Sequence, residues 1–258
     1  MRMANTYVYM YGVQLISSLL SLLPAKDSLP SRPGIVHRLD AGTSGALLVA
    51  LTRASHTHLS SLFRDRTICK KYIAVVSGNL PIQSSPGVGV DNDNGDIVVK
   101  NFISRHPTQR TKFRVTPEVQ MRTTAKGKFA ESHIRLLAGG RGQLSVVEVE
   151  IKTGRSHQIR VHLAGLGCDI VGDSLYGLGA PSDGKRPMLH ARELSFEDEK
   201  GKNVFVRAVI PEDFVKIVED GVEGGGEQVE KWAMEDAEGS SPNAGSASAS
   251  VSNEAMLV

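Results

Sequence analysis

The strongest constraint on the fold is a strand pattern near the middle of the chain. Between residues 144 and 151 apolar and charged side chains alternate, with Val147, Val149 and Ile151 on one side and two glutamates on the other. This period of two is typical of a β-strand with one buried and one solvated face. The chain must therefore build a sheet and cover the apolar face of this strand.

The remaining elements do not alternate strictly along the chain. Short apolar runs predict four more strands, at residues 46–51, 72–76, 188–196 and 204–210. Two helices are predicted, one capped by Thr52 or Ser55 and one capped by Ser156 that runs to Ala164. Strands outnumber helices, which favours an α+β domain with a mixed or largely antiparallel sheet over a doubly wound parallel sheet.

The two ends differ in composition from the central part. Residues 1–30 contain leucines at helical spacing before Pro24 and predict an N-terminal helical segment, followed by one domain over residues 31–218. Residues 219–258 are acidic and rich in Gly, Ser and Ala, so we expect a disordered tail with Trp232 in a solvated helix. No apolar run approaches the roughly 20 residues that span a bilayer.

The net charge of +2 conceals an asymmetry. Residues 221–258 hold seven of the 28 acidic residues and one of the 30 basic ones, so the remaining chain has 29 bases and 21 acids, a net of +8. A basic body favours a polyanionic partner, and a merely soluble basic domain is the alternative. Two cysteines far apart in sequence exclude a disulfide-dense scaffold and favour a reducing compartment.

A polar segment, GIVHRLDAGTSG at residues 34–45, stands directly before the first predicted strand of the domain. The residues Thr43 to Gly45 predict a tight turn that orients Asp40 beside Arg38. An ionised, oriented carboxylate can act as a nucleophile or as a general base. The same residues also fit a structural Asp–Arg pair that closes the turn.

A second polar segment, TGRSHQIRVH at residues 153–162, opens the second predicted helix. Arg155, His157 and Arg160 gather at the helix N-terminus, where anions bind favourably, and Arg160 shares a face with His157. A capped core helix with solvated arginines is the alternative. The five-residue spacing of His157 and His162 does not place both on one metal, so no metal site is expected.

Taken together, the motifs resemble the RluA-type pseudouridine synthases. The matching segments, in the order of that family, are RPGIVHRLD at 32–40 with TSG at 43–45, KYIA at 71–74, GRSHQIRVH at 154–162, GD at 172–173 with YG at 176–177, and LHA at 189–191. The resemblance spans the chain from Arg32 to Phe214.

This resemblance implies an enzyme that converts uridines in ribosomal or transfer RNA to pseudouridine, without metal or organic cofactor. It also implies RNA as the partner, no membrane, and a monomer. Asp40 would be the catalytic aspartate, and Arg160 would pair with it. Tyr72 would pack on the flipped base and serve as a candidate proton acceptor.

The resemblance further implies a set of RNA-binding residues. Arg38 would reach the point where the target nucleotide leaves the stack, and the other candidates are His37, Lys71, Arg155 and His157. A non-catalytic RNA-binding protein with the same fold is the alternative function. A hydrolase that uses Asp40 and His37 is a more distant one, which the full motif series disfavours.

The beginning of the chain departs from the family pattern. Family members open the domain with a strand and a Lys-Pro segment upstream of the His-Arg-Leu-Asp motif, and neither is found here, nor is an RNA-binding module of the S4 type. Residues 7–23 resemble the helix that follows that strand. We expect either a truncated N-terminus or a lost piece of the sheet. Cytosol, nucleus and organelle all fit the sequence.

Overall fold

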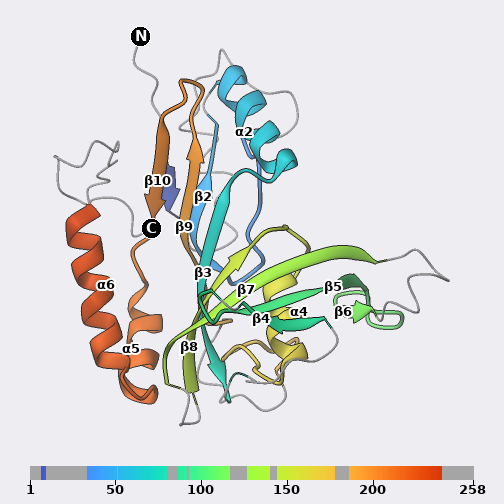
Figure 1. Ribbon diagram of the computed structural model, residues 1–258, viewed down its shortest axis with the longest axis vertical. Coiled ribbons are helices and arrows are strands. Elements are labelled where there is room, and N and C mark those ends of the chain that lie inside the picture. Colours follow the sequence, from blue (N-terminus) through green and yellow to red (C-terminus); the bar gives the residue numbers. More distant parts are fainter. Residues whose placement is uncertain are drawn as a thin grey trace, which may run out of the picture.

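The computed structural model describes residues 7–9, 34–50, 52–78, 80, 87–91, 93–116, 127–139, 144–177 and 186–239. These residues form a mixed, largely antiparallel sheet of ten strands with helices around it (Figure 1). The strand order is β1-β2-β9-β3-β8-β7-β5-β4, with β10 beside β9 and β6 beside β5. Within this sheet β2 and β9 run parallel, and the other pairs are antiparallel. The expected α+β class is confirmed.

The strands are β1 (Tyr7–Tyr9), β2 (Ser44–Leu48), β3 (Cys69–Ser77), β4 (Val88–Val90), β5 (Ile97–Arg105), β6 (Phe113–Thr116), β7 (Lys128–Ala138), β8 (Leu144–Ile151), β9 (Leu189–Glu197) and β10 (Asn203–Arg207). The helices are α2 (Arg53–Asp65), α4 (Gln158–Gly165), α5 (Glu212–Gly221) and α6 (Gly225–Gly239). The alternating segment at 144–151 is β8, as predicted.

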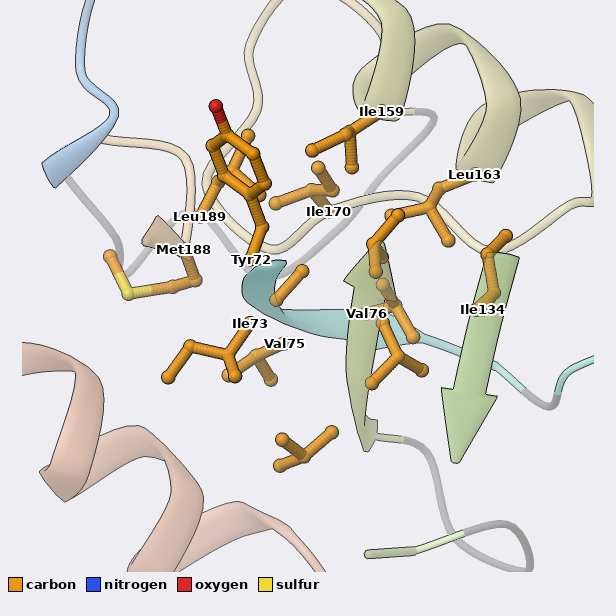
Figure 2. Packing of buried hydrophobic residues seen from close by; sticks show 14 of the residues in the cluster. Tyr72, Ile73, Val75, Val76, Ile134, Ile159, Leu163, Ile170, Met188 and Leu189 are labelled. Atoms are coloured by element: carbon orange, nitrogen blue, oxygen red, sulfur yellow. The ribbon is translucent and has the colours of Figure 1, made fainter. Parts of the chain in front are cut away.

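The central strand β3 is buried on both faces, because helices cover the sheet from two sides. Tyr72 points from β3 toward Ile159 and Leu163 of α4, whereas Ile73 and Val75 point toward the opposite side, where α5 and α6 lie (Figure 2). A strand that buries both faces reads as a continuous apolar run, which is why residues 72–76 lack alternation.

One row of paired residues places the end of the polar segment 34–45, where β2 begins, two strands away from Tyr72. Gly45 of β2 pairs with Ala191 of β9, and Ala191 pairs in turn with Tyr72 of β3. Two strand spacings amount to about 10 Å. A Cβ at Gly45 would lie 2.3 Å from the Ala191 carbonyl oxygen, so only glycine permits this close approach.

The helix starts match the sequence in one case and differ in the other. Thr52 caps α2, because its hydroxyl accepts a hydrogen bond from the Ser55 N–H at 3.1 Å. In contrast, α4 begins after His157, which has a left-handed backbone (φ 55°) and makes no side-chain cap, so the predicted Ser156 cap is wrong. The loop before α4 is instead fixed by Gln158, described below.

The two ends of the chain also differ from expectation. Residues 7–9 form a strand on β2 rather than the start of a helix, and the predicted helix at Leu15–Leu23 lies outside the described residues. Residues 225–239 form the helix α6 instead of a disordered tail. Tertiary packing explains this helix: Trp232 is 5% exposed and contacts Phe214 edge-on, with ring centroids 6.2 Å apart.

No helix in the described part of the chain is long and apolar enough to cross a membrane.

Candidate functional site

The segment before β2 is held in place by backbone hydrogen bonds at both of its ends. The Ala50 N–H donates to the Gly34 carbonyl at 2.8 Å, and the Thr43 N–H donates to the Asp40 carbonyl at 3.0 Å. Gly42, with φ +82°, completes the tight turn that the sequence predicted between Asp40 and Thr43. Asp40 therefore stands at a fixed position in the turn before β2 and is half-buried.

The charge of Asp40 acts on side chains from three other parts of the chain. Burial raises the pKa of Tyr72 on β3, and the Asp40 charge raises it further. Burial lowers the pKa of His157, and the Asp40 charge partly offsets this lowering. The same charge also contributes to the raised pKa values of Arg160 and Tyr176. We call these five residues, Asp40, Tyr72, His157, Arg160 and Tyr176, the Asp40 cluster.

Arg160 makes its ion pair with Asp173 rather than with Asp40. Its Nε and a terminal nitrogen each lie 2.7 Å from the Asp173 carboxylate, in a bidentate pair with side chains 8% and 0% exposed. Burial would raise the pKa of Asp173, but the hydrogen bonds from Arg160 outweigh it and lower the pKa. The expected direct pairing of Arg160 with Asp40 is therefore corrected: Arg160 is near enough to feel the Asp40 charge, but Asp173 holds it.

Asp173 is itself fixed by its own loop. Its Oδ1 accepts hydrogen bonds from the N–H groups of Leu175 at 2.9 Å and Tyr176 at 3.1 Å. The carboxylate thus has four donors, which is what a buried charge requires. This pair orients the Arg160 guanidinium, which lies over the Tyr176 ring at 5.0 Å from its centroid.

Tyr72 contributes an apolar wall with a polar tip. Its side chain is 9% exposed, and burial first and the Asp40 charge second raise its pKa. A phenol whose pKa is raised stays protonated at neutral pH, so the residue suits stacking against a base better than it suits proton abstraction.

Gln158 fixes the loop that carries Arg155 and His157. Its carbonyl oxygen accepts from the Thr153 hydroxyl at 2.7 Å and from the Arg155 N–H at 3.0 Å. Its amide nitrogen donates to the Glu131 carbonyl and to the Ser132 hydroxyl, both at 2.9 Å. Gln158 lies in the GRSHQIRVH motif, but nothing in the sequence shows that its side chain holds the loop before α4 against β7.

Two residues expected in the RNA-binding set do not join the cluster. Nε2 of His37 accepts a hydrogen bond from the Leu48 N–H at 2.8 Å, and the His37 ring stacks on Phe63. Burial together with the Lys70 charge lowers the pKa of His37 to about 3. His37 is therefore a neutral residue that connects the loop to β2. Lys71 lies 3.4 Å from Glu148, and strand alternation places its side chain on the face opposite Tyr72.

Arg38 and Arg155 remain beside the cluster. Arg38 is exposed. Its charge lowers the pKa of His157, although burial and the Arg160 charge lower that pKa more. The Arg155 Nε donates to the Phe129 carbonyl at 2.7 Å, and its guanidinium has no carboxylate partner among the described residues.

Sequence reasoning missed the roles of Asp173 and Tyr176. Both lie in the GD and YG motifs that were matched, but their spacing alone does not show that they meet Arg160 and His157. Among the described residues, no group of three or more His, Cys, Asp and Glu side chains is arranged to hold a metal ion.

Comparisons with known proteins identify the family that the chain resembles. Residues 11–165 match the family model described as RNA pseudouridylate synthase. The chain is 34% identical over 190 residues to an uncharacterized RNA pseudouridine synthase, YlyB, of Bacillus subtilis, covering 73% of this chain and 56% of that protein. It is 33% identical over 220 residues to the ribosomal large subunit pseudouridine synthase D of Haemophilus ducreyi, covering 80% and 60%.

A solved structure has the same fold. Human RNA pseudouridylate synthase domain containing 1 superposes with a TM-score of 0.56 at 27% identity, over 69% of each chain. The present chain spans only somewhat more than half the length of the curated relatives named above. Because the family model covers more than half of the chain and the described residues build the same fold, the chain belongs to the RNA pseudouridylate synthase family.

Proposed function

We propose that this protein isomerises uridine to pseudouridine in RNA, with Asp40 as the group that acts on the ribose. The observation that carries this proposal is the Asp40 cluster: a carboxylate fixed by a tight turn, beside a buried tyrosine and a buried arginine. Relatives named for the ribosomal large subunit make large-subunit ribosomal RNA the first candidate substrate, with transfer RNA as the second.

The reaction exchanges one bond of the base for another. The bond from N1 of uracil to C1′ of ribose breaks, the detached uracil rotates, and a bond forms from C5 to C1′. The hydrogen on C5 is lost as a proton and N1 gains one, so no oxidant or reductant is consumed. An oriented carboxylate supports this exchange either by adding to C1′ or by taking the proton from C2′.

The cluster residues suit separate parts of this reaction. The Asp40 carboxylate would meet the sugar, and the Tyr72 ring would stack on the uracil, which must leave the helical stack to reach the pocket. Extrusion of a base costs a few kcal/mol, and stacking on an aromatic ring returns about 1–3 kcal/mol. Arg38 would occupy the space that the extruded base leaves, and Arg155 would contact phosphate.

The decisive experiment compares wild type with Asp40→Asn on unmodified large-subunit ribosomal RNA and transfer RNA transcripts. With tritium on C5 of uridine, each turnover releases one tritium to water, so the assay detects modification at any uridine of the transcript. We expect release by wild type and a loss of at least 10³-fold in Asp40→Asn, with RNA affinity within about twofold. Tritium release by Asp40→Asn at the wild-type rate would contradict the proposal.

Two further measurements sharpen the result. If wild type binds RNA but releases no tritium from either transcript, the protein is a non-catalytic RNA-binding member of the family. A primary isotope effect with uridine deuterated at C2′ would assign proton abstraction at C2′ rather than addition to C1′.

A further inference from the structure

A short chain of hydrogen bonds joins the Asp40 cluster to the hairpin formed by β5 and β6. The Phe113 N–H, at the start of β6, donates to the Tyr176 hydroxyl at 2.8 Å. The same hydroxyl lies 2.8 Å from Nδ1 of His157. The rings of Phe113 and Tyr176 each contact the His157 ring edge-on, at 5.2 and 5.6 Å between centroids.

The directions of these bonds follow from the donors available. The Tyr176 oxygen accepts from the Phe113 N–H, and Nδ1 of His157 is the one acceptor within reach of the phenolic proton among the described residues, so we assign that proton to the bond with Nδ1. Burial raises the pKa of Tyr176, so this proton is present at neutral pH. Nδ1 is then an acceptor, and in a neutral imidazole the other proton must lie on Nε2.

His157 has the features of a functional residue rather than a packing residue. Its backbone is left-handed, with φ 55°, which is uncommon for a residue other than glycine and costs energy that the surrounding contacts must offset. Among the described residues, Nε2 has no hydrogen-bond partner. Its proton is therefore an unused donor, close enough to Asp40 to feel the charge of that carboxylate.

The hairpin on the other side of Tyr176 is basic. Arg105 at the end of β5 lies over the Phe113 ring, 5.1 Å from its centroid, and its guanidinium donates to the Arg110 carbonyl. Arg105 and Arg110 are exposed, and Lys112 is half-buried next to Phe113. We call residues 105–113 the basic hairpin. The bond from Phe113 to Tyr176 is the polar contact between this hairpin and the Asp40 cluster, beside the apolar packing of Phe113 and Val115 near Val161 of α4.

We propose that Tyr176 is a positioning residue that seats the basic hairpin beside the Asp40 cluster and holds His157 with its Nε2–H as a donor for the bound RNA. This inference rests on the proposed function only for the identity of the ligand. The geometry supports it because one hydroxyl makes both contacts at 2.8 Å, while the ring packs on Arg160.

The sharpest test is Tyr176→Phe, which keeps the ring over Arg160 and removes only the hydroxyl. The ¹⁵N shifts of the His157 imidazole report the tautomer directly, and the signal is assigned as the one that disappears in His157→Gln. We expect the Nε2–H form alone in wild type and a mixture of tautomers in Tyr176→Phe. An Nδ1–H tautomer in wild type would overturn the inference, whether or not the protein makes pseudouridine.

RNA binding provides the second readout. The probe is the unmodified large-subunit transcript, and we expect its Kd to rise about tenfold in Tyr176→Phe, with the change appearing in KM more than in kcat where turnover is measured. His157→Gln keeps an N–H donor near the Nε2 position and should bind more tightly than His157→Leu. Equal Kd values for wild type and Tyr176→Phe, or for the two His157 variants, would refute the proposal.

Discussion

The buried pair between Arg160 and Asp173 allows a prediction whose magnitude follows from the structure. The change Asp173→Asn keeps an oxygen for the Leu175 and Tyr176 N–H groups but removes the charge that neutralises Arg160. Removing one partner of a buried pair typically costs about 3–5 kcal/mol, because the remaining charge is left without compensation. Both side chains are at least nine-tenths buried, so solvent screening reduces this cost little.

Urea unfolding measures the effect. With a slope of roughly 1–3 kcal/mol/M, a loss of this size lowers the urea midpoint by about 1–5 M. The double variant Arg160→Gln with Asp173→Asn leaves no buried charge and should recover about half of the loss. The control is Asp65→Asn, which removes the exposed pair with Arg64 and should leave the midpoint unchanged.

The same variants separate stability from activity. In Asp173→Asn the Arg160 guanidinium loses its bidentate partner, and we expect it to turn toward Asp40 and occupy the carboxylate that the substrate needs. Tritium release should fall at least tenfold in the single variant for this reason, and at least tenfold in the double variant because the guanidinium over the Tyr176 ring near Asp40 is then absent. A midpoint shift below about 0.5 M for Asp173→Asn, or full activity in the restabilised double variant, would refute this reasoning.

Two other changes test the sheet and its buried histidines. Gly45→Ala should lower the urea midpoint strongly, because the added Cβ would lie 2.3 Å from the Ala191 carbonyl oxygen. The control Gly89→Ala, whose Cβ would have no atom within 4 Å, should leave the midpoint unchanged. Equal midpoints for the two variants would contradict the close approach. Burial lowers the pKa of His162 to about 4 and of His190 to about 3. Like His37, these histidines bind a proton more readily in the unfolded chain, so the free energy of unfolding should fall by about 1.4 kcal/mol per pH unit per histidine from pH 6.5 down to about 4. His162→Asn should remove its own share of this slope, and an unchanged slope would contradict the prediction.

The sequence predicts those parts of the fold that depend on local patterns. Alternation identifies β8, the apolar run identifies β3, and the Thr52 cap marks the start of α2. The helix α6 is different, because its own composition is acidic and poor in apolar residues. Its stability comes from burial of Trp232 against Phe214 and from the pair of Asp236 with Arg192 at 2.8 Å, which are contacts between distant segments.

The same distinction applies to the candidate site. The motifs identify which residues matter, but partners are set by the paths of the loops that bring segments together. Asp173, rather than Asp40, holds Arg160 because the turn after residue 173 aims its carboxylate at α4 with two backbone donors behind it. Lys71 and Tyr72 are neighbours in a matched motif, yet strand alternation sends their side chains to opposite faces.

The distribution of charge connects the basic body to the site. Several bases of the described chain are neutralised within the sheet, such as Arg135 by Asp96 at 2.8 Å and Lys71 by Glu148 at 3.4 Å. In contrast, Arg38, Arg155 and the basic hairpin have no carboxylate partner among the described residues.

Arg38 lies near His157 of the Asp40 cluster, and the basic hairpin is joined to the cluster by the bond from Phe113 to Tyr176. A polyanion that approaches Asp40 meets repulsion from that carboxylate and attraction from the cations around it. Because Asp173 already offsets the charge of Arg160, the attraction must come from the outer bases. For the RNA substrate proposed above, these cations would offset the repulsion that the Asp40 carboxylate alone exerts on a phosphate backbone.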